Sequence, residues 1–430
     1  MRQLLKNAML YTADGVLGNG FIAIDGDTIV YIGAVRPDGS FDSEKDMGGK
    51  LLMPGLINCH THISMTLLRG VGTDLPLQKW LFDEIFPVEA RLTEEDIAAG
   101  ANLAMLEMLA CGTTSFSDMY FYSDLLADTV CRSGMKANIC QHVQSFDAAD
   151  RYIDNSFARK MEALYSNWHG AGNGRIRVDS CLHGEYTCFS EDVATGVAAF
   201  AKEHDLHMHV HMSETASEHR ECQTRRDGLT PAGWFDKMGV FDVPASAAHS
   251  IWVSEEDMTL MAHKGVTAVH NPSSNMKLGS GFAPVPRMIE KGVRVALGTD
   301  GAASNNNLDM MEELHLASVI HNGHHCDATL LPAKTMIDMA TRNGALAQGR
   351  EDTGVLAVGK KADIIAIDLD KPHLYPCLDA AGLITYAAQG SDVCMTMVNG
   401  KILYENGEYL TLDREKIMAE AKCAVARLYK

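Results

Sequence analysis

The stretch LINCHTH, residues 56–62, is a short run of mostly apolar residues that closes on two histidines one residue apart. It follows a Pro54-Gly55 turn, and its composition is typical of a short buried strand. Residues i and i+2 of a strand point to the same face and lie about 6.6 Å apart, so His60 and His62 can reach one metal ion together. A hydrogen-bonded histidine pair at a strand end is the other interpretation, and further ligands elsewhere in the chain must decide.

Seven more segments repeat the pattern of a short apolar run that ends in polar residues. We expect strands at 56–62, 113–118, 135–141, 176–183, 206–211, 245–250, 266–271 and 293–300. Helical segments separate most of them, as at 93–112, where Thr93 is a helix cap and Gly112 a stop signal. Eight strand–helix units predict an α/β fold, a (β/α)8 TIM barrel. The alternative, an open parallel sheet, would need a glycine-rich nucleotide-binding turn that the sequence lacks.

The two ends of the chain differ from the middle and resemble each other. FIAIDGDTIVYIG (21–33) is a hairpin pattern, and alternation returns at 362–370 and at 395–410, where Asn-Gly turns occur. Neither end is long enough for a stable core, so both termini should form one small β-sandwich domain. We therefore divide the chain into three parts: a composite sandwich formed by residues 1–55 and 353–412, the barrel at 56–352, and a C-terminal helix at 413–430.

Composition restricts the partners and the compartment. A formal net charge of −19 argues against nucleic acid and against an anionic membrane surface. No apolar run is long enough for a membrane span, and MRQLLKNAML at the start has no secretory h-region. The 11 cysteines are odd in number and never form a C-x-x-C pair, which indicates reduced thiols and a cytoplasmic protein.

In a barrel of this type the catalytic groups collect at the C-terminal ends of the strands. The predicted strands end at His60 and His62, Asp118, Gln141, His183, His211, His249, His270-Asn271 and Asp300. Apolar residues would serve packing better at these positions. The concentration of polar groups, more than any single residue, predicts an active site at this end of the barrel.

His60, His62, His211 and Asp300 could form a His-His-His-Asp set that leaves one position open for water, as a catalytic zinc site requires. Asp300 alone could equally be a turn-forming Asp-Gly residue. His207 and His209 share a face with His211 but lie deeper, so we expect them in the core or behind the ligands.

Glu214 follows His211 by three residues and could take a proton from a metal-bound water. It could also serve a helix start by satisfying free amides. His249 could polarise the water or carry a proton, and a buried structural histidine is the alternative. The cluster HNGHHCD (321–327) follows a helix and lies away from any strand end, so we favour a polar loop over a second metal site.

Four segments of the chain resemble the amidohydrolase superfamily, and more narrowly its methylthioadenosine/S-adenosylhomocysteine deaminase group. They are PGLINCHTHISMTLLRG (54–70), HMSETASEH (211–219), the stretch HNPSSNMKLGSG to NNNLDM (270–310) and GKKADIIAID (359–368). The resemblance implies one divalent ion, zinc before iron or manganese, on His60, His62, His211 and Asp300, with Glu214, His249 and Asp300 catalytic. Members with two metals carry a lysine that VDSCLHGE (178–185) lacks, so one ion is expected.

The same resemblance suggests residues that bind the substrate. KWLFDEIFPVEARLT (79–93) would place Glu89 on the ribose hydroxyls and Trp80 beside the substrate. His183 matches a position that contacts the base, and Arg151 one that meets the 5′ substituent. Trp80 and Arg151 could equally be a packed aromatic ring and a solvated charge.

The activity that the resemblance implies is hydrolytic deamination of 5′-modified adenosines. Methylthioadenosine, S-adenosylhomocysteine, 5′-deoxyadenosine and adenosine would give inosine analogues and ammonia, and we expect a homo-oligomer with a small-molecule nucleoside as its partner. One alternative is a related amidohydrolase that acts on an amino- or chloro-substituted heterocycle of the guanine or triazine type. The substrate of such an enzyme has no ribose, so Glu89 would find no hydrogen-bond partner on it. A non-enzymatic relative of the barrel is the other alternative, against which the complete ligand set argues.

Overall fold

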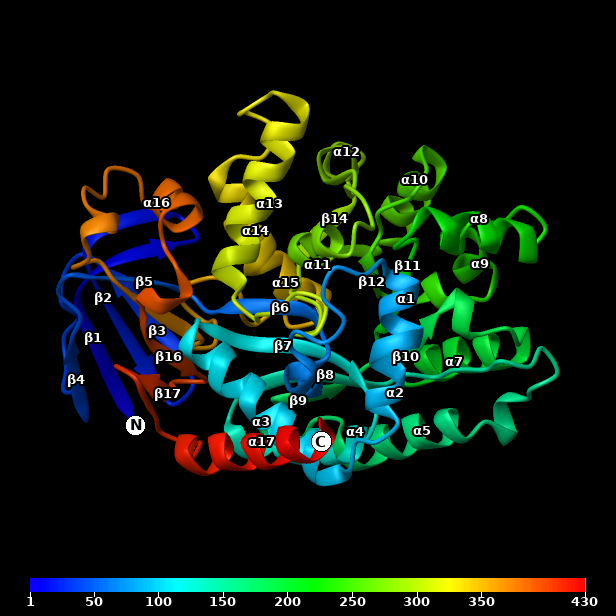
Figure 1. Ribbon diagram of the computed structural model, residues 1–430. Coiled ribbons are helices and arrows are strands. Elements are labelled where there is room, and N and C mark those ends of the chain that lie inside the picture. Colours follow the sequence, from blue (N-terminus) through cyan, green and yellow to red (C-terminus); the bar gives the residue numbers. More distant parts are fainter. Residues whose placement is uncertain (430) are drawn as a thin grey trace.

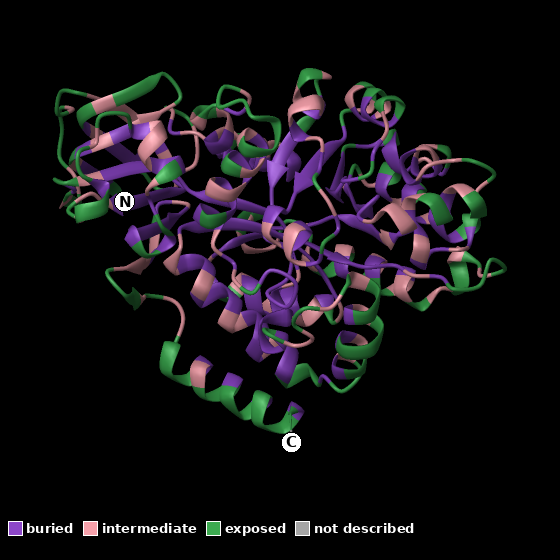
Figure 2. Ribbon diagram, turned by 45° about the horizontal axis from the view of Figure 1, so that its top comes forward, coloured by how far each residue is buried: buried purple, intermediate pink, exposed green. Residues whose placement is uncertain are grey.

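The computed structural model describes residues 1–429, in which a parallel barrel lies beside a sheet made from both ends of the chain (Figure 1). The barrel strands are β6 (Leu56–Thr61), β7 (Thr113–Tyr120), β8 (Lys136–Gln141), β9 (Ile176–Val178), β10 (Ser180–Gly184), β11 (Met208–Met212), β12 (Ala245–His249), β13 (Thr267–His270) and β14 (Arg294–Leu297). They pair in parallel in the orders β6-β7-β8-β9 and β10-β11-β12-β13-β14. These strands are buried almost throughout (Figure 2).

Two junctions join these sets of strands into one barrel. Val143, just past β8, bridges in parallel to Leu182 of β10. At the other junction the amide of Asp300 donates to the carbonyl of His60 at 2.9 Å, and the amide of Thr299 donates to Oδ1 of Asn58 at 3.0 Å. The predicted (β/α)8 barrel is confirmed, with one change: the strand expected at 176–183 breaks at Asp179 into β9 and β10.

Helices cover the outside of the barrel. The longer ones are α3 (Glu94–Ala110), α4 (Ser123–Ser133), α5 (Ser156–Trp168), α7 (Glu191–Glu203), α8 (Ala216–Arg225), α10 (Glu255–Lys264), α13 (Met310–His325) and α14 (Ala333–Ala340). The shorter ones are α1 (Leu77–Lys79), α2 (Phe86–Glu89), α6 (Ala171–Gly174), α9 (Pro231–Lys237), α11 (Pro272–Lys277), α12 (Val285–Glu290), α15 (Arg342–Ala347) and α16 (Ala380–Tyr386). Thr93 caps α3 in a reciprocal capping box with Asp96, as its place before the helix predicts.

The sequence HNGHHCD (321–327) does not begin a loop, contrary to our expectation. Residues 321–325 form the last turns of α13, and the buried His321 has its Nε2 3.3 Å from Nε2 of His270. His321 packs against β13, and the polar composition of the segment gives no sign of this burial.

The terminal strands form one nine-stranded sheet. They are β1 (Arg2–Thr12), β2 (Gly15–Asp25), β3 (Thr28–Gly33), β4 (Ser43–Asp46), β5 (Lys50–Pro54), β15 (Ile364–Asp368), β16 (Val393–Val398), β17 (Lys401–Glu405) and β18 (Glu408–Tyr409). β15 pairs with β5, which joins the two ends of the chain, and both contribute to one apolar core with Leu10, Ile22 and Met397. The composite terminal domain therefore has a core of its own, although the exact boundaries of the domains stay predictions.

The C-terminal helix, α17 (Arg414–Leu428), runs across the barrel side of the molecule and presents a largely exposed outer face (Figure 2). Its buried residues Ala421, Ala424 and Leu428 pack with α3 residues in the barrel core. The helix predicted at 413–430 ends here at Leu428, and residue 430 lies outside the described part of the chain. Through residue 429, none of the helices combines the length and the apolar character that crossing a membrane requires.

A buried ion pair connects the barrel to the terminal sheet. Lys136 at the start of β8 pairs with Asp363, which precedes β15, and the side chains are 4% and 2% exposed. Asp363 also accepts from the Thr353 hydroxyl at 2.5 Å and from the Asn399 amide at 2.8 Å. Removing one partner of such a pair leaves a buried charge without compensation.

We therefore expect Asp363→Ala to lower the free energy of unfolding by about 3–5 kcal/mol, measured by urea denaturation. The matched control is Asp368→Ala at the end of β15, which breaks the part-exposed pair with Lys50 of β5 (2.7 Å). That change should cost no more than about 1 kcal/mol. Equal effects of the two substitutions would show that the buried pair does not hold the two domains together.

Candidate active site

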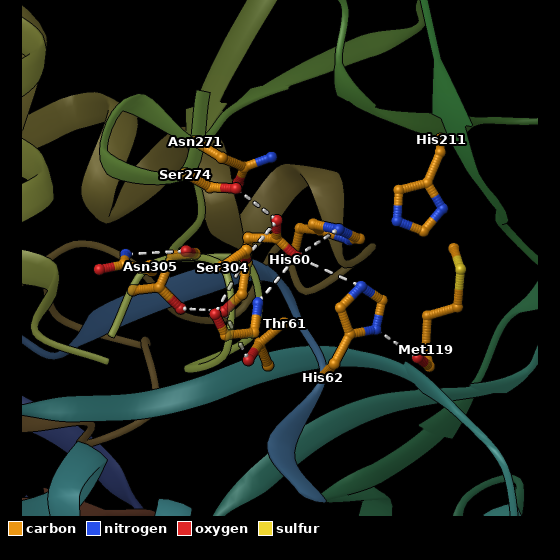
Figure 3. Close-up of polar contacts among 12 residues, drawn as sticks. His60, Thr61, His62, Met119, His211, Asn271, Ser274, Ser304 and Asn305 are labelled. Carbon is orange, nitrogen blue, oxygen red and sulfur yellow. Dashed lines mark hydrogen bonds and ion pairs between the residues drawn. The ribbon is translucent and has the colours of Figure 1, made fainter. Parts of the chain in front are cut away.

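Three strands bring four candidate ligands together at the C-terminal end of the barrel (Figure 3). His60 and His62 lie on β6 and just beyond it, His211 on β11, and Asp300 after β14. Ligand atoms of the three histidines lie within 4.8 Å of one another. Oδ1 of Asp300 is 3.5 Å from Nε2 of His60 and 3.3 Å from Nε2 of His62. The predicted ligand set is thus assembled in space from residues 240 positions apart.

The three rings offer the same nitrogen to the centre of this group. Nδ1 of His62 lies 2.5 Å from the carbonyl of Met119, and Nδ1 of His211 lies 2.7 Å from the carbonyl of His183. A backbone carbonyl can only accept, so both Nδ1 atoms carry a proton, and Nε2 is the nitrogen that each ring can offer to a metal ion. Nδ1 of His60 lies 3.1 Å from Nε2 of His209, the deeper histidine behind it.

A divalent metal ion fits this arrangement. Nε2 of His60 is buried and has no hydrogen-bond partner among the described residues, which is costly for a polar atom. The distances from Asp300 to the two imidazoles exceed those of a charge-assisted hydrogen bond. Imidazole nitrogens with one carboxylate are the donor set that zinc and similar ions take.

Asp300 is held in place from several sides. Its Oδ2 accepts from the hydroxyls of Ser274 at 2.7 Å and Ser304 at 2.8 Å (both serines are labelled in Figure 3), and its Oδ1 accepts from the amide of Gly301 at 2.7 Å. Burial alone would raise the pKa of Asp300, but the adjacent imidazoles of His60 and His62 hold that pKa well below its ordinary value. The group is therefore a carboxylate, as a metal ligand must be.

Glu214 and His249 lie next to the ligands. Oε2 of Glu214 is 3.8 Å from Nε2 of His249, and Nδ1 of His249 is 2.9 Å from Oδ1 of Asn275. Burial raises the pKa of Glu214. Burial would lower the pKa of His249, but the charges of Glu214 and Asp300 and the hydrogen bond to Asn275 together outweigh burial and raise this pKa. A carboxyl group and an imidazole with shifted pKa values in contact can exchange protons near neutral pH.

Glu218 fixes the backbone that carries Glu214. Its carboxylate accepts from the amides of Ser213 at 3.0 Å, Glu214 at 2.7 Å and Thr215 at 3.4 Å. Thr215 and Glu218 form a capping box at the start of α8. Our sequence analysis did not assign a role to Glu218, although the Thr-x-x-Glu spacing is a recognisable capping signal.

A cavity opens in front of these groups, and most of the predicted substrate residues line it. Trp80, Glu89, His183, Glu214, His249 and Asp300 are among the lining residues. Glu89 accepts a 2.5 Å hydrogen bond from the Tyr120 hydroxyl, and burial raises the pKa of Glu89. Trp80 donates from Nε1 to the carbonyl of Val71 at 3.0 Å.

Arg151 lies apart from this group. It is exposed and lines a separate hollow together with Asp147, Asp150 and Asp154. His142 and Tyr120, in contrast, line the cavity but were not predicted. Each stands within two residues of a predicted strand end, so a strand boundary shifted by one or two residues would have included them.

Comparisons with known proteins agree with this geometry. The 5-methylthioadenosine/S-adenosylhomocysteine deaminase of Thermoanaerobacter pseudethanolicus is 43% identical over 422 residues, which is 97% of each chain. The 5′-deoxyadenosine deaminase of Methanosarcina mazei is 42% identical over 99% of this chain and 98% of its own. An adenosine deaminase of Xanthomonas campestris, solved with bound zinc, superimposes with a TM-score of 0.93 at 32% identity and covers 99% of this chain and 98% of its own.

Other solved structures share the fold at lower identity. A triazine hydrolase of Arthrobacter aurescens has a TM-score of 0.92 at 23% identity, with 99% of each chain covered. At this identity the likeness shows the fold alone. The family model of the amidohydrolases matches residues 51–403, which include all the candidate metal ligands and catalytic residues. The chain therefore belongs to the amidohydrolase family.

Proposed function

We propose that this chain is a metal-dependent hydrolase that deaminates 5′-modified adenosines to the inosine analogues and ammonia. The observation that carries the proposal is one cavity that holds Glu214, His249 and Asp300 together with a part-buried Glu89. The first three can activate water and move protons, whereas Glu89 is suited to a vicinal diol such as that of ribose. The nucleoside deaminases at 42–43% identity, whose chains this one covers almost completely, support the same substrate class.

His60, His62, His211 and Asp300 would hold the metal, for which we propose zinc before iron or manganese. When bound in such a site, the ion lowers the pKa of its water ligand to about 7 and makes it a nucleophile at neutral pH. The zinc-bound neighbour from Xanthomonas supports this choice of metal.

The chain's own residues would then transfer the protons. Glu214, kept close to His249, accepts a proton from the attacking water and delivers it to the ring nitrogen beside the reacting carbon. His249 would stabilise the negative charge on the attacking oxygen. The carboxylate of Asp300 would take up the second proton of the water and pass it to the amino group. The amino group leaves as ammonia, and the base becomes that of an inosine analogue.

Other lining residues would position the nucleoside. Glu89, oriented by Tyr120, would accept hydrogen bonds from the ribose hydroxyls, and His183 would contact the base. Trp80 would close the cavity beside the substrate. We propose no contact for Arg151, because its hollow is separate from the cavity. The homo-oligomeric state and the cytoplasmic location stay predictions.

The competing function is removal of an amino or chloro group from a sugarless heterocycle. The triazine hydrolase and a guanine deaminase of C. acetobutylicum (21% identity, TM-score 0.84) share the fold. A free base would leave the part-buried Glu89 without a partner other than Tyr120, at a cost of about 1 kcal/mol or more. Glu89 therefore favours the nucleoside.

A substrate panel tests the proposed function. Metal-replete protein should release ammonia from 5′-modified adenosines, but neither ammonia from guanine nor chloride from a chlorotriazine, and chelation should abolish the release of ammonia. In the same panel Glu89→Ala should lose at least about tenfold in kcat/KM on nucleosides, because a hydrogen-bonded charge contact is removed. Faster turnover of guanine or triazine by the wild type would contradict the proposal.

A pair of substitutions separates the metal ligands from the proton carrier. Glu214→Gln keeps the shape of the side chain but cannot carry a proton, so kcat should fall about 10²–10⁴-fold while the metal stays bound. His211→Asn removes an imidazole ligand, so the metal itself should be lost. Metal content is measured by mass spectrometry and kcat by ammonia release. A metal-free Glu214→Gln protein, or one with nearly full activity, would refute the assigned role.

A further inference from the structure

His142 is a buried polar residue in the cavity to which the proposed mechanism gives no task. It directly follows β8, is 4% exposed and lines the same cavity as Glu89 and His183. Its Nε2 is buried and finds no hydrogen-bond partner within residues 1–429. The ring centroid lies 4.1 Å from that of Phe121 and 5.2 Å from that of His183. Native proteins leave few buried polar atoms unpaired, which makes a ligand the natural partner.

The position of His142 indicates which part of a nucleoside it would meet. Glu214 follows β11, His249 is the last residue of β12, and Asp300 follows β14. Glu89, in contrast, is hydrogen-bonded to Tyr120 at the end of β7. β8 is the neighbour of β7 and does not adjoin β11, β12 or β14. A nucleoside whose base meets Glu214 and whose ribose meets Glu89 therefore points its 5′ substituent toward the β8 side.

The cavity continues outward on this same side. Phe86, Glu89, Phe121 and Gln144 line both the cavity and a second hollow that reaches Tyr122, Phe146 and Lys160. Tyr122 and Phe146 are exposed, so this hollow lies toward the surface. His142 and Phe121 thus stand where a substituent on the ribose would leave the cavity.

The charges on this path disfavour an anionic substituent. The described residues that line the cavity include the carboxyl groups of Glu89, Glu214 and Asp300 but no lysine or arginine. Burial, with the nearby His183 and His62, lowers the pKa of His142 well below its ordinary value, so its ring is neutral. The cation in the second hollow, Lys160, is exposed and therefore well solvated. Arg151 lines a third hollow, which shares Gln144 and Phe146 with the second, but it is exposed and lines that hollow together with the carboxylates of Asp147, Asp150 and Asp154.

We propose that the imidazole of His142 hydrogen-bonds the polar atom of the 5′ substituent, and that this side of the cavity selects small neutral substituents over one that ends in a carboxylate. The favoured groups are a hydroxyl or a methylthio group, and the disfavoured one is the homocysteinyl group. This inference rests on the proposed deaminase function and narrows its substrate class. It gives His142 the role of a specificity-determining residue.

The first test compares adenosine, which carries a 5′ hydroxyl, with 5′-deoxyadenosine, which carries none. His142→Phe keeps an aromatic ring against Phe121 but removes both nitrogens. Its kcat/KM should fall at least tenfold on adenosine and less than threefold on 5′-deoxyadenosine. His142→Gln, which retains hydrogen-bonding groups, should keep most of the activity on adenosine. Thermal unfolding and metal content serve as controls for folding of both variants, and equal losses on the two nucleosides would overturn the inference.

The second test ranks substrates on the wild-type enzyme. The kcat/KM for methylthioadenosine should exceed that for S-adenosylhomocysteine at least tenfold, and Lys160→Ala should leave both values within twofold. Equal efficiencies, or a loss confined to S-adenosylhomocysteine in Lys160→Ala, would overturn the inference alone. Failure to deaminate any nucleoside would overturn the proposed function and this inference with it.

Discussion

Asp300 contributes both to the closure of the barrel and to the assembly of the metal site, so the two depend on each other. Its amide donates to the carbonyl of His60 and so helps to join β14 to β6. Its backbone has a φ of 61°, a left-handed conformation that non-glycine residues adopt rarely, although aspartate and asparagine tolerate it better than most. This conformation accompanies a carboxylate whose Oδ1 faces His60 and His62 and whose Oδ2 accepts from Ser274 and Ser304. Strain at one residue is thus offset by contacts that define the metal site.

Burial of the site shifts the pKa values of His60, His211 and Glu214 in the directions that the proposed chemistry needs. Burial lowers the pKa of His60 to about 4 and that of His211 well below its usual value, so both rings keep a lone pair for a metal at neutral pH. Burial acts in the opposite direction on Glu214, whose pKa rises toward the range in which a carboxylate can take up and return a proton. Burial of the site therefore keeps the rings of His60 and His211 neutral and also raises the pKa of Glu214, the proposed proton carrier.

The sequence predicted most of this site because strand ends and period-2 alternation place side chains reliably. His60, His62, His211 and Asp300 each lie at or within a few residues of the end of a strand, and the parallel barrel brings those ends to one rim. The hydrogen bonds that fix each ring, such as the one between His62 and Met119, depend on side-chain geometry that spacing does not encode.

Loops and strand boundaries limited the prediction elsewhere. We took Gln141 as the end of its strand, and the next residue, His142, lies in the wall of the cavity. Neighbouring residues of a strand face opposite sides, so an error of one position exchanges a cavity residue for its neighbour. Arg151 stands in the long connection after β8, where no periodicity fixes the direction of a side chain, and it points into a different hollow.

The central claim is that His60, His62, His211 and Asp300 hold one divalent metal ion. Crystallographic data collected on either side of the zinc absorption edge, from protein loaded with zinc, test it most directly. We predict one anomalous peak per chain, about 2.0–2.2 Å from the imidazole nitrogens and the carboxylate oxygen. A structure without a peak between these four side chains, or with the peak only at another cluster such as His324 and His325, would contradict the account.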